Sequence, residues 1–212
     1  MTDFLYPFID ADERDPGPLL DDLARSAAAK AEATVALRAA TSASVAAALS
    51  RLAVDMSARF SAGGRLLTFG NGGSATDAAS VAALFRSPPG GHPLPARSLA
   101  ADEAVLTALA NDVGFDLVFS RQVIAHGRAT DIALGVSTSG DSANVVRALA
   151  EARSRGLLTV GFAGYEGGAM AAARLDHCIV VPSASVHRIQ ETQAALLYDL
   201  WRQVQDVLAP AA

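Results

Sequence analysis

After Gly64 the chain alternates short apolar runs with longer segments whose apolar residues recur every three or four positions. The short runs predict buried strands, and the longer segments predict helices. This alternation indicates an α/β fold, in which a parallel sheet is covered by helices on both faces. We expect strands at 65–69, 96–100, 131–136, 157–163 and 178–181, and helices at about 75–85, 102–110, 115–126, 142–155 and 187–208.

The N-terminal region is alanine-rich and has a helical pattern. Apolar residues at 45, 49, 52, 56 and 60 follow one another at steps of three or four, as on one face of a helix. We interpret 19–62 as two helices that form a hairpin, broken near 41–42 and ended by the glycines at 63–64. Such a hairpin needs a partner surface, which could be the chain's own core or a neighbouring subunit.

Residues 1–18 end in Pro16-Gly17-Pro18 and predict an irregular arm. The rest, 19–212, then forms a single domain that includes the helical hairpin. The first 17 residues carry five acidic side chains and one arginine, the wrong charge for a targeting peptide. The longest uncharged stretch, 39–50, is shorter than the roughly 18 residues that a membrane span needs. We therefore expect a cytoplasmic protein without membrane contact.

Composition narrows the possible functions. With 51% hydrophobic residues, the 212-residue chain can bury a sizeable core. Its net charge of -5 argues against direct nucleic-acid binding, which usually needs a basic stripe. The single cysteine, Cys178, excludes an internal disulfide and a multi-cysteine zinc site. Lys30 is the only lysine, which leaves little scope for covalent chemistry based on lysine.

Two polar loops each follow a predicted strand and precede a predicted helix: Gly70–Ser74 and Ser137–Ser142. Both should lie at the carboxyl ends of parallel strands, where open α/β sheets bind ligands. Glycines allow a close backbone approach, helix N-termini offer N–H groups, and hydroxyls add donors, so the loops could hold a phosphate without lysine. Asp141 would repel a phosphate unless its carboxylate points away. The alternative is that these residues only turn the chain and cap helices.

Four motifs in this order resemble those of SIS (sugar isomerase) domains: Gly70–Ser74, Asn111-Asp112, Ser137–Ser142 and Arg188-Ile189-Gln190-Glu191. The resemblance covers roughly 20–208 and is closest to the phosphoheptose isomerase group, which includes DiaA-like regulators. It implies a flavodoxin-like sandwich and a homotetramer with sugar-phosphate sites at subunit interfaces. By position, the residues that would hold phosphate are Ser74, Ser137, Thr138, Ser139 and Ser142. The residues that would face the sugar are Asn71, Gly72, Gly73, Asn111, Asp112 and Gln190.

The catalytic positions depart from this resemblance. Exchange of an aldose and a ketose needs a base, and a metal or an acid to polarise the carbonyl. The family's isomerases carry a His and a Glu four apart on the helix after the first loop, and a Gln and a His eight apart on the last helix. The residues at those positions here are Ser80, Leu84, Gln190 and Tyr198. We therefore expect the usual zinc site to be missing, and we expect no metal and no other cofactor.

Two side chains could replace the missing groups. Asp77 lies one turn before Ser80 on the same predicted helix face, and His187 lies one turn before Gln190. An unperturbed imidazole titrates near pH 6.5, where a general base is useful, so His187 is the better candidate. The alternatives are a polar residue at a helix start for His187 and a solvated or capping carboxylate for Asp77.

Three functions remain open at this point. The first is a sugar-phosphate isomerase with a rearranged, metal-free site. The second is a non-catalytic protein that binds a sugar phosphate or a protein partner, as DiaA-like regulators do, and the loss of the acid/base pair favours it. The third is a structural paralogue in a mixed oligomer, where another chain supplies the catalytic residues. All three imply binding of a phosphorylated sugar or of a second protein chain.

Overall fold

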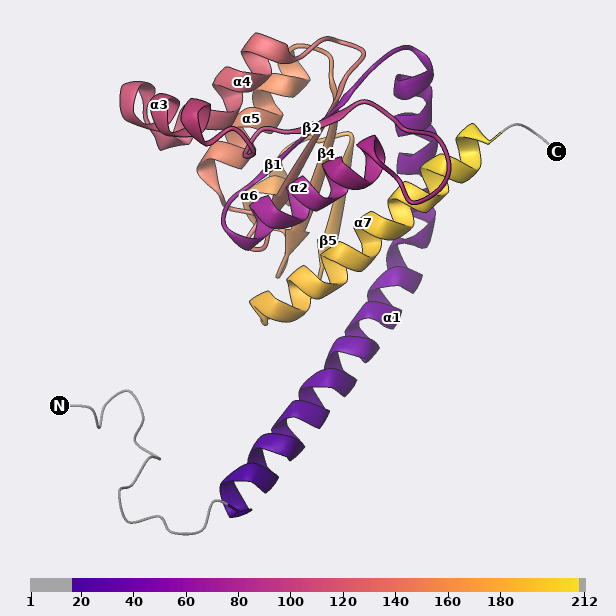
Figure 1. Ribbon diagram of the computed structural model, residues 1–212, viewed down its shortest axis with the longest axis vertical. Coiled ribbons are helices and arrows are strands. Elements are labelled where there is room, and N and C mark those ends of the chain that lie inside the picture. The colour runs from indigo at the N-terminus through magenta and orange to yellow at the C-terminus, as the bar shows by residue number, and fades with distance from the viewer. Residues whose placement is uncertain (1–16, 210–212) are drawn as a thin grey trace. The chain divides into compact units, whose positions relative to one another are not determined.

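The computed structural model describes residues 17–209. The chain divides into two units, 1–36 and 37–212, and each is described by itself. The first unit contributes the first half of helix α1 (Gly17–Ser61). The second unit holds the rest of α1 and all other elements (Figure 1). In chain order these are β1 (Leu66–Gly70), α2 (Gly73–Arg86), β2 (Ala96–Ser98), α3 (Glu103–Val113), the 3-10 turn η1 (Phe115–Leu117), α4 (Val118–His126), β3 (Ile132–Ser137), α5 (Ala143–Ser154), β4 (Leu158–Gly164), α6 (Gly168–Ala172), β5 (His177–Val181) and α7 (Val186–Leu208).

The five strands form one parallel sheet in the order β2-β1-β3-β4-β5. Side chains alternate between its two faces, as the period of a strand requires. Leu66 and Ile132 join the core beneath α1, α2 and α7, whereas Leu67 and Ala133 join the core beneath α4, α5 and α6. The α/β class with helices on both faces, predicted from the alternation of apolar runs, is confirmed.

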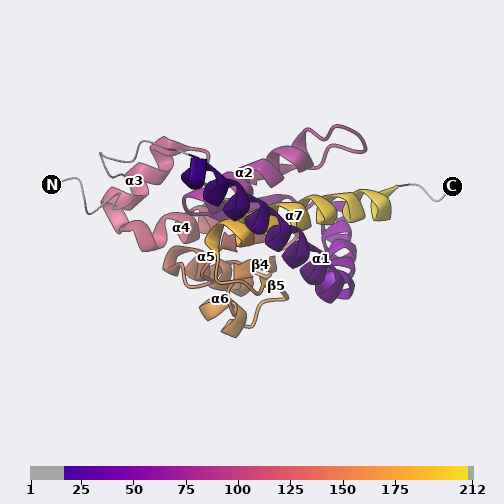
Figure 2. The ribbon, with the colours of Figure 1, turned by 90° about the horizontal axis from the view of Figure 1, so that it is seen from below.

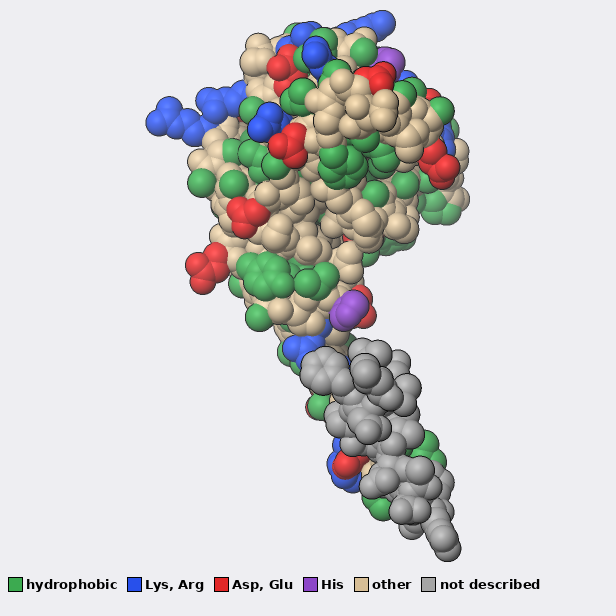
Figure 3. Space-filling model, turned by 90° about the vertical axis from the view of Figure 1, so that its left-hand side faces the viewer, with side chains coloured by type: hydrophobic (Ala, Val, Ile, Leu, Met, Phe, Trp, Pro, Cys, Tyr) green, Lys and Arg blue, Asp and Glu red, His purple; other side chains and the backbone are tan. Residues whose placement is uncertain are grey.

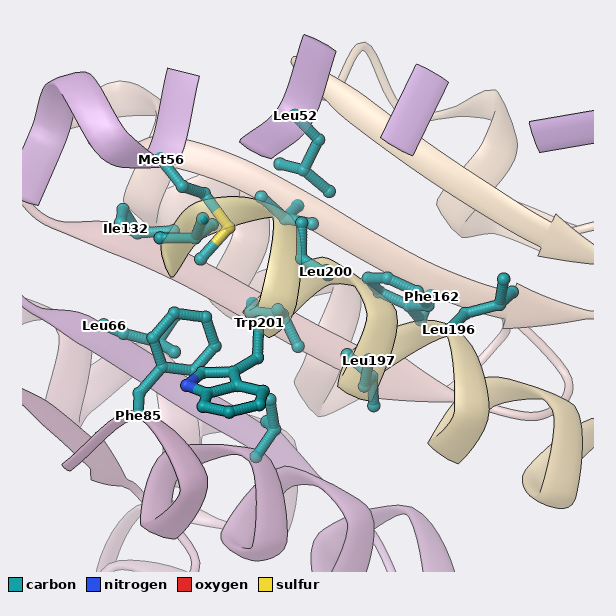
Figure 4. Packing of buried hydrophobic residues seen from close by; sticks show 14 of the residues in the cluster. Leu52, Met56, Leu66, Phe85, Ile132, Phe162, Leu196, Leu197, Leu200 and Trp201 are labelled. Atoms are coloured by element: carbon teal, nitrogen blue, oxygen red, sulfur yellow. The ribbon is translucent and has the colours of Figure 1, made fainter. Parts of the chain in front are cut away.

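The larger core cluster holds α2 beside α7 (Figure 4). Leu52 and Met56 from α1 pack into it with Leu200 from α7, and all three are buried. Phe60 stacks on Phe85 with 5.6 Å between ring centroids. Full burial of each large apolar side chain contributes about 1.5–3 kcal/mol. The cluster therefore fixes the two helices that flank the candidate site.

The N-terminal hairpin expected from the sequence is wrong, because α1 is one helix of 45 residues. The expected break at 41–42 does not occur, and the Ser44 hydroxyl donates to the Thr41 carbonyl at 2.9 Å inside the continuous helix. The expected apolar stripe on its second half is buried from Leu49 to Phe60. By length and composition alone, α1 is the one helix within 17–209 that could cross a membrane, but its second half packs into the protein core.

Other differences from the sequence expectation concern boundaries. The predicted arm loses Gly17 and Pro18 to α1, and the remainder, 1–16, lies outside the described residues. The short helix α6 was not expected, because five residues are too few to show a helical period. Strand β3 runs one residue further than expected and ends at Ser137, which places this hydroxyl on the sheet edge itself.

The amino end of the sheet is held by a buried carboxylate. Asp131 is fully buried and accepts hydrogen bonds from the backbone N–H groups of Arg65, at 2.9 Å, and Arg128, at 3.1 Å. The Arg65 guanidinium adds a salt bridge of 2.9 Å. A buried charge persists when it is paired and hydrogen bonded in this way. Asp131 is therefore structural, since it lies at the end of the sheet opposite the loops that follow β1 and β3.

Candidate functional site

The two polar loops predicted from the sequence lie side by side, because they leave neighbouring parallel strands. β1 pairs with β3 up to Gly70 and Val136, so both strands end at the same edge of the sheet. The side-chain amides of Asn71 and Asn144 join the loops in both directions. Asn71 Nδ2 donates to Asn144 Oδ1 at 2.8 Å, and Asn144 Nδ2 donates to Asn71 Oδ1 at 2.9 Å. Asn71, which was predicted to face the sugar, thus also links the two loops through hydrogen bonds.

Sequence reasoning missed Asn144. It stands in the first turn of α5 and is 3% exposed, on the same helix face as the buried Ala148. A polar residue on the buried face of a helix is costly unless it is hydrogen bonded. Its place four residues before Ala148, the spacing of one helix face, was the available signal.

Two glycines of the first loop have specific roles. Gly72 has φ 53 and ψ -126 at the start of α2, a conformation that L side chains rarely adopt. A Cβ on Gly73 would overlap Gln190 Nε2, so a side chain at this position would displace the Gln190 amide. Gln190 and the first loop, both predicted to bind the ligand, are brought together at this contact.

The second loop gathers hydroxyl groups around Ser137. Ser137 Oγ lies 2.9 Å from Ser142 Oγ and 3.4 Å from Ser139 Oγ, and it accepts a hydrogen bond from Gly140 N at 3.2 Å. Ser142 precedes α5 but makes no side-chain capping bond. Capping therefore does not explain Ser142. The cluster can instead present several O–H donors at the N-terminus of α5, a suitable place for an anion.

The carboxylate of Asp141 is held by the neighbouring loop. Asp141 Oδ1 accepts a hydrogen bond from Ala169 N at 2.7 Å, at the start of α6. The segment around Gly167 also touches Gly140. The negative charge that appeared to conflict with phosphate binding is thus directed to a backbone N–H of α6.

The other predicted binding residues differ in their exposure and in their distance from the two loops along the fold. Ser74 is buried at the start of α2, and Thr138 is half-buried just beyond β3. Asn111 and Asp112 are exposed near the end of α3, and Asn111 Nδ2 donates to Asp112 Oδ1 at 2.9 Å. Within 17–209, no hydrogen bond joins this pair to either loop. Figures 1 and 2 show α3 outside α4, on the side away from α7.

A cavity of about 300 Å³ opens between α2 and α7. Helix α2 lines it with Asp77, Ser80, Val81 and Leu84, and α7 lines it with Ala194, Leu197 and Tyr198. Three of these residues, Ser80, Leu84 and Tyr198, are positions at which the resemblance implies a metal ligand in the isomerases. Together with Val81, Ala194 and Leu197 they line a mainly apolar space, which the spacing of these residues along the chain does not predict.

Asp77 is the candidate acid/base residue that faces this cavity. Its Oδ2 is buried and has no hydrogen-bond partner, and burial raises the pKa of the carboxyl above its ordinary value of 3.8. His187 is exposed in the first turn of α7 and does not line the cavity. The two candidates are therefore not paired as a preformed acid/base dyad within the described chain.

The face that carries α3 to α6 shows acidic and basic side chains interspersed (Figure 3). Among residues 17–209, no three His, Cys, Asp or Glu side chains are grouped so that they could hold a metal ion. The groups that the described residues bring to the site are hydroxyls, amides, backbone N–H groups and the half-buried carboxyl of Asp77.

Comparison with known proteins gives a consistent family. Residues 31–164 match the SIS domain. A phosphoheptose isomerase of Paramagnetospirillum magneticum is 47% identical over 152 residues, covering 71% of this chain and 79% of the relative. That of Thermodesulfovibrio yellowstonii is 45% identical over 157 residues, covering 71% and 76%.

Solved structures agree with this assignment. The phosphoheptose isomerase of Neisseria gonorrhoeae superposes with a TM-score of 0.82 at 34% identity, covering 87% of this chain and 99% of the other. That of Francisella tularensis gives a TM-score of 0.82 at 29% identity, covering 86% and 97%. The motifs, the parallel sheet and these similarities show that the chain belongs to the SIS domain family, with phosphoheptose isomerases among its relatives.

Proposed function

We propose that the protein binds a phosphorylated sugar at the edge of the sheet where β1 and β3 end. The observation that carries this proposal is the hydroxyl cluster of Ser137, Ser139 and Ser142, braced against the first loop by Asn71 and Asn144. Hydrogen bonds to a charged group contribute about 1.5–3 kcal/mol each, so a few of them hold a phosphate without a lysine. Ser74 and Thr138 complete the proposed phosphate site.

The sugar would then lie toward Gln190, which meets Gly73 between the loops and the cavity. Gly72 and Asn71 would border it on the first loop. Asn111 and Asp112 remain proposed sugar contacts, and the assembly implied by the resemblance, a homotetramer with sites at subunit interfaces, is one way for them to reach a ligand. The relatives named phosphoheptose isomerase make sedoheptulose 7-phosphate the first ligand to test.

The four positions that hold zinc in the isomerases do not fit zinc in this chain. Zinc sites in proteins use Cys sulfur, His nitrogen and carboxylate oxygen. Ser80, Leu84 and Tyr198 offer a hydroxyl, a hydrocarbon and a phenol, and Gln190 adds only an amide. We therefore derive no catalytic step through a metal, and isomerisation would have to use this chain's own groups.

Metal-free isomerisation has defined requirements. A base takes a proton from the carbon next to the carbonyl and returns it to the former carbonyl carbon, while another proton passes between the two oxygens, so no atom is gained or lost. His187 is the proposed base, and Asp77 is the proposed acid for the carbonyl oxygen. Because the structure does not pair them, both would have to meet across the bound sugar.

The apolar residues in the cavity favour a second candidate, a binding protein without turnover, as in DiaA-like regulators. Leu84 can neither hold a metal nor move a proton, and it stands where the isomerases carry a glutamate. A partner protein would then recognise and bind the ligand-bound form of this protein. In either case we propose a cytoplasmic location and a homotetramer, which light scattering coupled to size exclusion would test.

An NMR time course of sedoheptulose 7-phosphate with the purified protein, with and without added zinc, separates these functions. Turnover that His187→Ala abolishes supports the rearranged active site. Line broadening of the sugar phosphate without turnover supports the binding function. If neither is seen, and inorganic phosphate fails to compete in a binding assay, the phosphosugar proposal is wrong.

A further inference from the structure

The cavity between α2 and α7 lies next to the proposed phosphosugar site, along the same two helices. Gly73 and Gln190 are in contact where α2 and α7 begin to pack, and Asp77, the first cavity residue on α2, lies one turn further along. One helical turn rises about 5.4 Å, which the carbon chain of a sugar phosphate spans. A ligand anchored by its phosphate at the two loops therefore extends its other end toward this cavity.

The walls of the cavity are unsuited to a polyhydroxylated group. Val81 and Leu84 from α2 face Ala194 and Leu197 from α7, so most of the lining is hydrocarbon. A hydroxyl placed against such walls loses its water without gaining a hydrogen bond, which is unfavourable. A methylene group in the same place gains from burial. The cavity has a volume of about 300 Å³, which suits a small group and lies at the lower limit for ligand pockets.

One polar atom in the cavity still lacks a partner. Asp77 Oδ2 is buried and makes no hydrogen bond, and the carboxyl stands beside the apolar residues of α2. A buried polar atom of this kind is stabilised when a ligand supplies its partner. Ser80 and Tyr198 are exposed and border the open side. The cavity thus offers one polar position among hydrocarbon walls.

We propose that this cavity selects sugar phosphates that are deoxygenated at the end away from the phosphate, with Asp77 hydrogen bonded to the one uncharged oxygen that remains there. The inference rests on the proposed phosphosugar binding and names the ligand class of that same site. A ligand that lacks the oxygen next to its carbonyl cannot exchange aldose for ketose. The inference therefore concerns binding and not turnover.

A matched pair of ligands tests it. Isothermal titration with 2-deoxyribose 5-phosphate and ribose 5-phosphate compares a methylene and a hydroxyl-bearing carbon at the far end, while inorganic phosphate reports the loops alone. We expect the deoxy sugar to bind about five- to tenfold more tightly, from methylene burial and the avoided cost of an unpaired hydroxyl. Equal binding, or tighter binding of ribose 5-phosphate, overturns the inference and leaves the proposed function intact. Absence of binding by all three overturns the proposed function and the inference together.

Substitutions of cavity residues test whether the preference for the deoxy sugar arises in the cavity. Leu84→Asn should reduce the ratio of the two affinities to about one while phosphate binding stays within twofold, and Leu84→Met, the matched control, should keep the preference. Val81→Thr, which changes a methyl for a hydroxyl at nearly constant shape, gives a second variant if Leu84→Asn does not fold. If the folded polar variant keeps the preference for the deoxy sugar, the preference arises elsewhere in the protein. That result overturns the assignment to this cavity.

Discussion

Asn71 and Asn144 exchange two side-chain hydrogen bonds, of 2.8 and 2.9 Å, across the gap between the loops that follow β1 and β3. The pair links residues 73 positions apart in the sequence. Because Asn144 is buried, its amide has little access to water that could replace a lost partner. The paired strands β1 and β3 bring the two proposed ligand-binding loops together, and this contact holds them to each other beyond the strand ends.

Asn144→Ala tests that dependence. Removing one amide leaves Asn71 without its partner and frees the two loops, so we expect the free energy of unfolding to fall by about 1–3 kcal/mol. Binding of a sugar phosphate should weaken about tenfold, which corresponds to about 1.4 kcal/mol. Chemical denaturation and isothermal titration measure the two effects.

Arg147→Ala is the control, since its side chain is exposed on the same helix and forms only a surface ion pair with Asp116. It should change stability by less than about 1 kcal/mol. Equal loss of affinity in both variants would show that the amide pair has no particular role at the site.

Ser137→Ala removes the hydroxyl at the centre of the second loop. Ser137 Oγ is within hydrogen-bond distance of two other serines and accepts from Gly140 N, so its loss should disturb the whole cluster. We expect affinity for inorganic phosphate to fall about tenfold or more, in line with a hydrogen bond to a charged group. Ser154→Ala, at the far end of α5, should leave phosphate affinity unchanged. Undiminished binding by Ser137→Ala would contradict the proposed phosphate site.

The sequence predicted what depends on local pattern. Periodicity predicts the succession of strands along the chain and the buried stripe from Leu49 to Phe60. Glycine and serine at strand ends predict both loops. The hairpin is wrong because serine and threonine at 41–42 do not by themselves end a helix, and Ser44 bonds back to Thr41 within one continuous helix. The partner of Asn71 could not be predicted, since it is chosen by tertiary packing and not by spacing.

Asp77→Asn tests what the half-buried carboxyl contributes to stability at different pH values. Burial raises the pKa of Asp77 above 3.8, so the folded protein retains this proton at pH values where the unfolded chain has lost it. The contribution of Asp77 to stability is therefore lost as pH rises through the raised pKa. Asparagine does not titrate, so the melting temperature of the variant relative to the parent should be higher at pH 7.5 than at pH 4. A difference that does not change between these two pH values would show that Asp77 is not held in its protonated form by folding.

Asp131→Ala separates stability from ligand binding. The substitution removes the acceptor for two backbone N–H groups and leaves the Arg65 guanidinium without its carboxylate. Loss of one partner of a buried pair costs about 3 kcal/mol or more, and we expect a cost at the lower end because Arg65 is partly exposed. Ligand affinity of the remaining folded protein should stay within twofold, since this end of the sheet is remote from the loops. A large loss of affinity would imply coupling along β3 that the packing does not indicate.

Introducing metal donors at the positions where the resemblance implies them tests the expectation that this chain lacks a zinc site. Ser80, Leu84 and Tyr198 line one cavity, and Ser80 and Leu84 stand four apart on α2, a spacing that places them on one helix face. The triple variant Ser80→His, Leu84→Glu and Tyr198→His should bind one zinc ion per site, whereas the parent should bind none. At a zinc concentration 100 times the dissociation constant, the ion would add about 2.7 kcal/mol to stability. Leu84→Gln in place of Leu84→Glu is the matched control, because an amide is the weaker ligand. Stoichiometric zinc binding by the parent would contradict the assignment of these positions as non-ligating, and it would return a metal-assisted reaction to consideration.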